Sequence, residues 1–213
     1  MSCFLCTDAI SKFRGNTPKI GSRHKRNEVG GKCTLKLECR IIGVEAVCGP
    51  VDTIFFYTTD DLQQGGANVM IEVQRRALVD LDRLLAERGL YLPRHVVLQF
   101  DNCSENKNQF MLGYASLLVE KHHVDKINLC FLVVGHTHCS IDQYFSALAT
   151  FIFRCGFIPT PLALHQLLRC AHKSKLPAVV EALTVRLTKQ PFFGFFTLSI
   201  VEPRFSFYLF IAH

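Results

Sequence analysis

Apolar residues recur along the chain with two distinct periods. Alternating or continuous apolar runs predict strands over residues 2–7, 33–47, 53–58, 95–100 and 127–134. Apolar residues at helical spacing predict helices over residues 69–88, 109–121 and 140–153, with further helical pieces over 160–170 and 177–187. The order β-β-β-α-β-α-β-α up to residue 153 is typical of an α/β fold in which helices pack against a mixed sheet.

Polar and glycine-containing segments separate these elements. Residues 9–31 are polar and basic, which predicts a loop, and Gly43 inside the second strand indicates a bulge. Asn68 precedes a helical run and is the expected N-cap. We therefore expect one core over residues 1–155 and a C-terminal extension over residues 156–213, helical at first and Phe-rich at its end.

The charge is modestly basic and unevenly placed. The formal net charge is +6, which leans toward polyanionic partners without requiring them. One segment, residues 12–26, contains no acid and carries six cations: Lys12, Arg14, Lys19, Arg23, Lys25 and Arg26. This segment is a candidate DNA contact, although a solvated basic loop would have the same composition.

The cysteines and the apolar stretches bear on the cellular compartment. The ten cysteines lie largely within apolar runs, where free cysteine behaves as a small buried hydrophobe. No signal-peptide pattern opens the chain, so we expect a reduced compartment, the nucleus or cytoplasm. The most apolar stretch, residues 192–201, has about half the roughly 20 residues that a membrane-spanning helix needs, so no membrane partner is expected.

Three aspartates occupy the ends of predicted elements. Asp8 and Asp101 each follow a strand, and Asp142 lies in the first turn of the helix after the fifth strand. Carboxylates that converge at a sheet edge repel one another unless a cation lies between them, and Mg²⁺ or Mn²⁺ prefers such oxygen ligands. The plainer alternative is that Asp101 opens a turn and Asp142 favours a helix dipole.

Two long motifs resemble a known family. The stretches LQFDNCSENKN (98–108) and FLVVGHTHCSIDQYF (131–145) look like the transposase-derived, integrase-like domain of many eukaryotic repeat-element proteins. TDAISKFR (7–14) and GGAN (65–68) resemble its upstream segments, so the likeness covers roughly residues 5–155. The resemblance implies a ribonuclease-H-like fold, with Asp8, Asp101 and Asp142 as a catalytic, Mg²⁺- or Mn²⁺-binding triad.

Polar residues near the triad are candidates for a supporting role. The asparagines of the first motif either orient the Asp101 turn, contact phosphate or simply suit turns: Asn102, Asn106 and Asn108. The histidines of the second motif, His136 and His138, either assist the metal site or hydrogen-bond DNA. The histidines with Cys130 and Cys139 match no usual zinc spacing, and Cys103 has no legible partner that would make it a nucleophile.

Three functions remain open at this point. The first is a metal-dependent DNA-cleaving or strand-transfer enzyme, and the second is a domesticated or decayed relative that binds DNA or protein without cutting. The third is an unrelated α/β binding domain whose acids are accidental. No recognition module for DNA is readable in the sequence, which favours the second over the first, and a homo-oligomer stays open.

Overall fold

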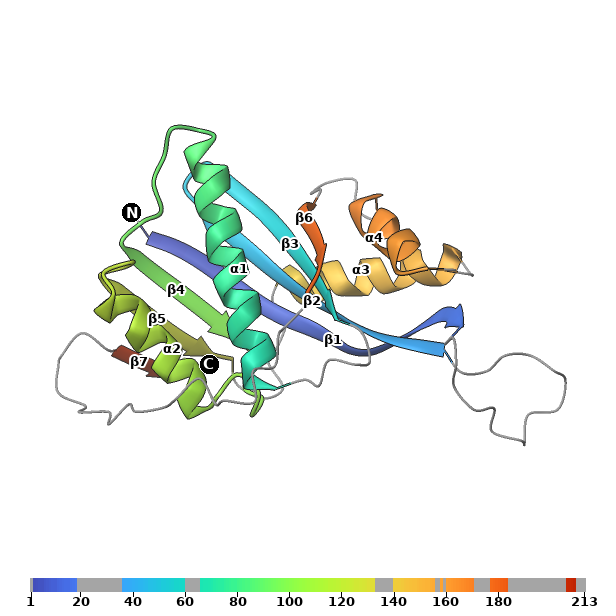
Figure 1. Ribbon diagram of the computed structural model, residues 1–213, viewed down its shortest axis with the longest axis horizontal. Coiled ribbons are helices and arrows are strands. Elements are labelled where there is room, and N and C mark those ends of the chain that lie inside the picture. The colour runs from blue at the N-terminus through green and yellow to red at the C-terminus, as the bar shows by residue number, and fades with distance from the viewer. Residues whose placement is uncertain are drawn as a thin grey trace, which may run out of the picture.

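The computed structural model describes residues 2–18, 36–59, 66–132, 140–155, 158, 160–170, 177–183 and 206–209. Within them, seven strands form one sheet in the order β6-β3-β2-β1-β4-β5-β7 (Figure 1). The strands are β1 (Ser2–Pro18), β2 (Lys36–Cys48), β3 (Val51–Thr59), β4 (His95–Phe100), β5 (Lys126–Phe131), β6 (Pro177–Ala182) and β7 (Ser206–Leu209). The helices are α1 (Ala67–Ala86), α2 (Gln109–Glu120), α3 (Ser140–Cys155) and α4 (Pro161–Cys170).

The sheet is mixed because one strand runs against the rest. β2 is antiparallel to both of its neighbours, β1 and β3, whereas every other pairing in the described sheet is parallel. The predicted order β-β-β-α-β-α-β-α is confirmed through α3. The α/β class with a mixed sheet is therefore correct.

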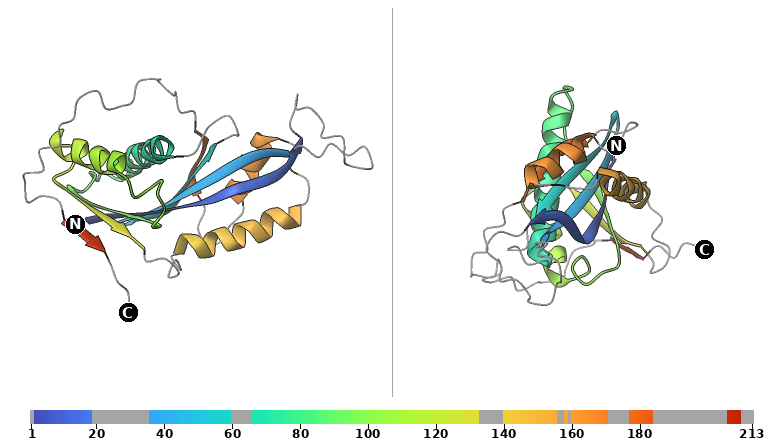
Figure 2. Two further views of the ribbon diagram at one scale, coloured as in Figure 1. Left: turned by 90° about the horizontal axis from the view of Figure 1, so that it is seen from below. Right: turned by 90° about the vertical axis from the view of Figure 1, so that its right-hand side faces the viewer.

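Helices cover both faces of the sheet, as the left view of Figure 2 shows. α1 and α2 pack on one face over the larger apolar cluster, whose fully buried members include Leu5, Val44, Phe55 and Leu98. α3 and α4 pack on the other face over a second cluster around Ile41 and Phe56. Strand residues alternate between these two clusters, which is the period of two expected for a sheet covered on both sides.

The first strand is longer than the sequence pattern predicted. β1 does not end at Asp8 but continues to Pro18, so residues 9–18 are strand and not loop. Beyond residue 10 it pairs with β2 as a ribbon, with Phe13 opposite Cys39 and Arg14 opposite Glu38 (Figure 1). A two-stranded ribbon outside the layered part of a sheet needs no continuous apolar face, so hydrophobic periodicity did not reveal it.

Two further expectations were wrong. Residues 177–182 form strand β6, not a helix, because Val179 and Val180 suit an edge strand that pairs with β3, and a leading proline is tolerated at a strand start. The cap of α1 is Gly66 and not Asn68, and no side chain caps it. The φ of Gly66 is 121°, a conformation that glycine adopts without steric cost.

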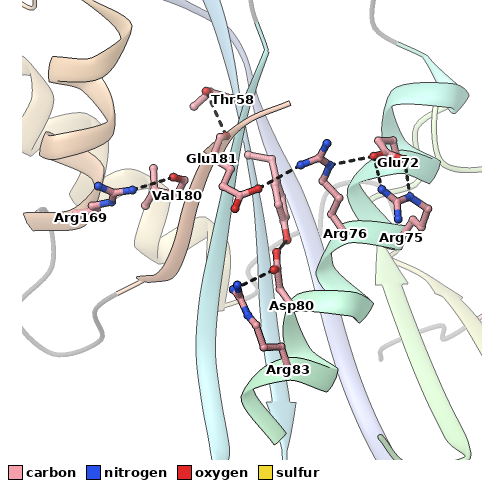
Figure 3. A network of polar contacts seen from close by, with 10 residues as sticks. Thr58, Glu72, Arg75, Arg76, Asp80, Arg83, Arg169, Val180 and Glu181 are labelled. Carbon is pink, nitrogen blue, oxygen red and sulfur yellow. Dashed lines mark hydrogen bonds and ion pairs between the residues drawn. The ribbon is translucent and has the colours of Figure 1, made fainter. Parts of the chain in front are cut away.

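The C-terminal segments join the same sheet as the core. β6 is tied to α1 by Arg76, which contacts Glu181 of β6 at 3.2 Å and Glu72 of α1 at 2.9 Å (Figure 3). Close by, the Tyr57 hydroxyl donates to Asp80 at 2.8 Å, and burial is the main cause that raises the pKa of this tyrosine far above its ordinary value. In the part of the chain that the structure describes, no helix is long and apolar enough to cross a membrane.

Candidate active site

The first two aspartates lie side by side on neighbouring parallel strands. Thr7 of β1 is the register partner of Phe100 of β4, so Asp8 and Asp101 each follow one member of this pair. Alternation places Asp8 on the same face as Cys6 and Asp101 on the same face as Gln99, whose amide donates to Cys6 Sγ at 3.5 Å. Both aspartates therefore belong to the face that α3 covers.

Asp142 reaches Asp8 from the first turn of α3. The two side chains share a hydrogen bond, although 134 positions separate them in sequence. Burial, followed by this hydrogen bond and by the charges of Asp142 and Asp101, raises the pKa of Asp8 to about 7, and the hydrogen bond from Ala9 N to Asp8 Oδ1 (2.7 Å) opposes the rise. Two carboxyl groups this close hold a proton between them unless a cation replaces it.

A close approach of α3 to the sheet makes this contact feasible. A Cβ atom on Gly43 would lie 2.9 Å from both Ile141 Cδ1 and Phe145 Cζ. Gly43 is the register partner of Asp8, and β2 pairs without a register shift at this position, so the expected bulge is absent. The glycine serves instead to let the helix that carries Asp142 lie directly on the sheet beside Asp8.

The turn after β4 holds the third carboxylate. Asn106 is 97% buried and its Nδ2 donates to Asp101 Oδ1, while the thiol of Cys103 also hydrogen-bonds to Asp101. Burial, and then this contact with Asp101, raise the pKa of the Cys103 thiol. Cys103 is thus kept as a thiol, which is not the form that acts as a nucleophile.

The remaining asparagines of the motif have separate positions. Asn108 caps α2: its Oδ1 accepts from Phe110 N and Met111 N, both at 3.0 Å, and its Nδ2 donates to Glu105 O at 2.6 Å. Asn102 is half-buried in the same turn. The motif therefore combines one residue that contacts the aspartate, Asn106, with one that begins the next helix.

Sequence reasoning missed two contacts that hold the site in place. Arg40 of β2 forms an ion pair with Glu105 at 2.5 Å, which fastens the turn after Asp101 to the sheet. Glu45 of β2 is buried and accepts a hydrogen bond from the hydroxyl of Ser140. These contacts join segments 65 and 95 residues apart, and no local pattern announces them; Gly43 carried a signal, but it was interpreted as a bulge.

Several candidate residues lie outside the described part of the chain. Of the six basic residues, Lys12 and Arg14 belong to strand β1. The other four fall outside the described residues: Lys19, Arg23, Lys25 and Arg26. His136, His138 and Cys139 fall outside as well. Cys130 is a buried free thiol in β5, and burial raises its pKa.

The carboxylates form a contacting pair with a third acid close enough to act on it through charge. No three His, Cys, Asp or Glu side chains among the described residues are arranged to hold a metal ion. Asp8 and Asp142 are in direct contact, and Asp101 affects Asp8 only by electrostatic repulsion. The three carboxylates therefore come from β1, from the turn after β4 and from α3, and only Asp8 and Asp142 are in contact.

Comparison with known proteins places most of the chain in one family. A family model described as "Domain of unknown function (DUF7869)" matches residues 31–190, a range that contains Asp101 and Asp142. Searches of curated proteins and of solved structures find no match.

Proposed function

We propose a function for this chain, which belongs to the DUF7869 family. The proposed function is a transposase-derived, metal-dependent cleavage or transfer of DNA strands, carried by Asp8, Asp101 and Asp142. The observation that carries this proposal is the contact between Asp8 and Asp142, together with the charge that Asp101 exerts on the same carboxyl. Unrelated surface acids have no reason to converge on one sheet position from two strands and a helix, because their repulsion destabilises the protein.

The fold supports a ribonuclease-H-like assignment for the core. Three antiparallel strands come first, and β4 and β5 then add in parallel beside β1 through the connecting helix α2. Sites in such sheets form where the parallel strands end at their carboxyl side, and Asp101 follows the last residue of β4. Asp8 lies within β1, next to the residue at which the parallel pairing with β4 ends. The position of α3 over this point is what a triad with one helical member requires.

The proposed metal is Mg²⁺ or Mn²⁺, because carboxylate oxygens are the ligands that these ions prefer. All three side chains offer oxygen ligands, and a bound cation would relieve the repulsion between Asp8 and Asp142 that their hydrogen bond now limits. Bound divalent ions would activate a water and stabilise the leaving oxygen of a phosphodiester. Cys103 remains a thiol, so it does not add a soft thiolate ligand that would favour zinc.

The surrounding residues orient this set. Asn106 donates to Asp101 Oδ1 and so restrains the rotation of that carboxylate. The Arg40–Glu105 ion pair and the Asn108 cap hold the turn at its two ends, on β2 and on α2. Side chains fixed in this way lose little entropy when a ligand binds, which favours binding.

The proposed partner is DNA. The β1–β2 ribbon extends past the strands that flank it (Figure 1). Lys12 and Arg14 are residues of β1. The basic segment 12–26 would supply cations to phosphates on either side of a cleaved position.

A second candidate is a relative that binds DNA or protein without cutting. The observation that favours it is that the three acids do not form a ready metal-ligand group among the described residues. It differs from the first proposal in one measurable respect, since it predicts DNA binding without metal-dependent cleavage.

Nicking of a supercoiled plasmid tests the proposal. The protein should nick DNA with Mn²⁺ or Mg²⁺ and not with EDTA, and Asp101→Asn should lower the rate by roughly a hundredfold or more, as expected for loss of a metal ligand. Asp82→Asn, which removes an exposed acid of α1, is the matched control and should cut like the parent. Binding of DNA with no metal-dependent nicking by the parent would select the non-cutting relative.

A further inference from the structure

Glu45 is a buried acid on the face of the sheet that α3 covers. Its residue exposure is 7%, although carboxylates are seldom buried without a specific partner. It lies two positions after Gly43 on β2, and its register partner on β1 is Cys6, two positions before Asp8. Glu45 is therefore next to the Asp8–Gly43 pair on the same face.

The carboxylate of Glu45 accepts a hydrogen bond from the hydroxyl of Ser140, the first residue of α3. The first backbone N–H groups of a helix have no partner within the helix, and a negative charge close to them is favourable. Glu45 thus offers α3 a negative charge and a hydrogen-bond acceptor from another element, at the end of the helix where Asp142 is found.

Two contacts then define where the start of α3 lies. Gly43 sets how closely the helix approaches the sheet, because Ile141 and Phe145 pack against its bare Cα. Glu45 sets where the helix begins along the strand, because it holds Ser140. Asp142 is two residues beyond Ser140, so a shift of the first turn would carry its carboxyl away from Asp8.

We propose that Glu45 is a positioning residue that anchors the first turn of α3 and so holds Asp142 against Asp8. Its effect on metal binding rests on the proposed function, whereas its effect on the helix does not. Nothing in this role requires Glu45 to touch the metal or the DNA.

Four single variants and one double variant of the full chain separate this role from simple stabilisation. Glu45→Ala removes the anchor, Ser140→Ala removes its partner, and Glu45→Gln keeps an acceptor for the hydroxyl. Asp80→Asn is the matched control, because Asp80 is 8% exposed and so is buried to the same degree as Glu45. Asp80 accepts a hydrogen bond from the Tyr57 hydroxyl and lies on α1, across the sheet from α3. Amide hydrogen exchange of residues 141–145 is measured relative to the amides of β4, and Mn²⁺ affinity is measured by calorimetry.

Exchange in the first turn of α3 should rise about tenfold in Glu45→Ala, as expected for loss of a hydrogen bond to a charged group. Ser140→Ala should act similarly, the double variant should add little to either single change, and Glu45→Gln should retain most of the protection. Mn²⁺ affinity should fall severalfold in Glu45→Ala and stay unchanged in Asp80→Asn.

Unchanged relative exchange over residues 141–145 in Glu45→Ala would overturn the proposal, and so would full additivity with Ser140→Ala. A parent protein that binds no Mn²⁺ would instead refute the proposed function, and the exchange results would still decide whether Glu45 anchors α3.

Discussion

Asp8 and Gly43 are register partners in the antiparallel pairing of β1 with β2, and each has a defined relation to α3. The missing side chain of Gly43 lets Ile141 and Phe145 pack against the strand, and Asp8 hydrogen-bonds to Asp142 of the same helix turn. Gly43 and Asp8, on adjacent strands, thus together bring the carboxyl group of Asp142 to the sheet.

Gly43→Val should displace α3 because the new side chain overlaps Ile141 and Phe145. We expect a loss of about 1–3 kcal/mol in the free energy of unfolding, the range typical of overpacked cores, measured by urea denaturation. Val47→Ala changes a 41% exposed residue on the same strand and should alter stability by less than about 0.5 kcal/mol. Equal stability of Gly43→Val and the parent would show that α3 does not lie where described.

Stability without metal should fall as the pH rises toward neutrality. The pKa of Asp8 is raised from its ordinary value of 3.8 to about 7, so the folded protein keeps a proton that the unfolded chain releases between these values. This contribution is fully present below about pH 4 and is lost as the pH passes 7.

The measurement is the urea midpoint of the parent and of Asp8→Asn at pH 5 and pH 8 in EDTA. The variant cannot titrate at this position, so it should lose less stability than the parent between the two pH values. Equal changes in the midpoints of the parent and the variant between pH 5 and pH 8 would contradict the raised pKa.

Asn106 and Asn108 should differ in what their loss affects. Asn108→Ala removes the cap of α2 and should cost about 1 kcal/mol of stability with little change in Mn²⁺ affinity. Asn106→Ala removes the donor to Asp101 and should lower Mn²⁺ affinity by about 10-fold or more, as other residues that orient metal ligands do. Calorimetric titration measures the Mn²⁺ affinity of both variants. Equal affinities of Asn106→Ala and Asn108→Ala would contradict a role of Asn106 in orienting Asp101.

Much of the fold followed from the hydrophobic pattern, because strands such as β4 and helices such as α2 carry clear periods. The placement of Asp8 and Asp101 after paired residues of neighbouring parallel strands was also expected, although β1 continues beyond Asp8 to Pro18. The packing of α3 against Gly43 could not be predicted, because it is a contact between segments about 100 residues apart in the sequence. Strand β6 was mistaken for a helix because its pairing with β3, and not its local sequence, determines its conformation.

The basic segment gives a prediction about salt. Replacing Arg23, Lys25 and Arg26 by alanine should weaken binding to all DNA sequences alike and reduce the slope of log affinity against log salt by about 3, because each phosphate contact contributes about 0.9. Fluorescence anisotropy with an arbitrary duplex at several salt concentrations measures this slope. An unchanged slope in the triple variant would leave the segment without a role in binding.

The carboxyl carbons of the three aspartates give the most direct test of the central claim. In ¹³C-detected NMR spectra, substoichiometric Mn²⁺ should broaden the side-chain signals of Asp8, Asp101 and Asp142 first and together, because a paramagnetic ion acts most strongly on its own ligands. Asp82, an exposed acid on α1, should broaden only at much higher Mn²⁺. Broadening of the three aspartates at the same Mn²⁺ concentration as Asp82 would contradict a shared metal site.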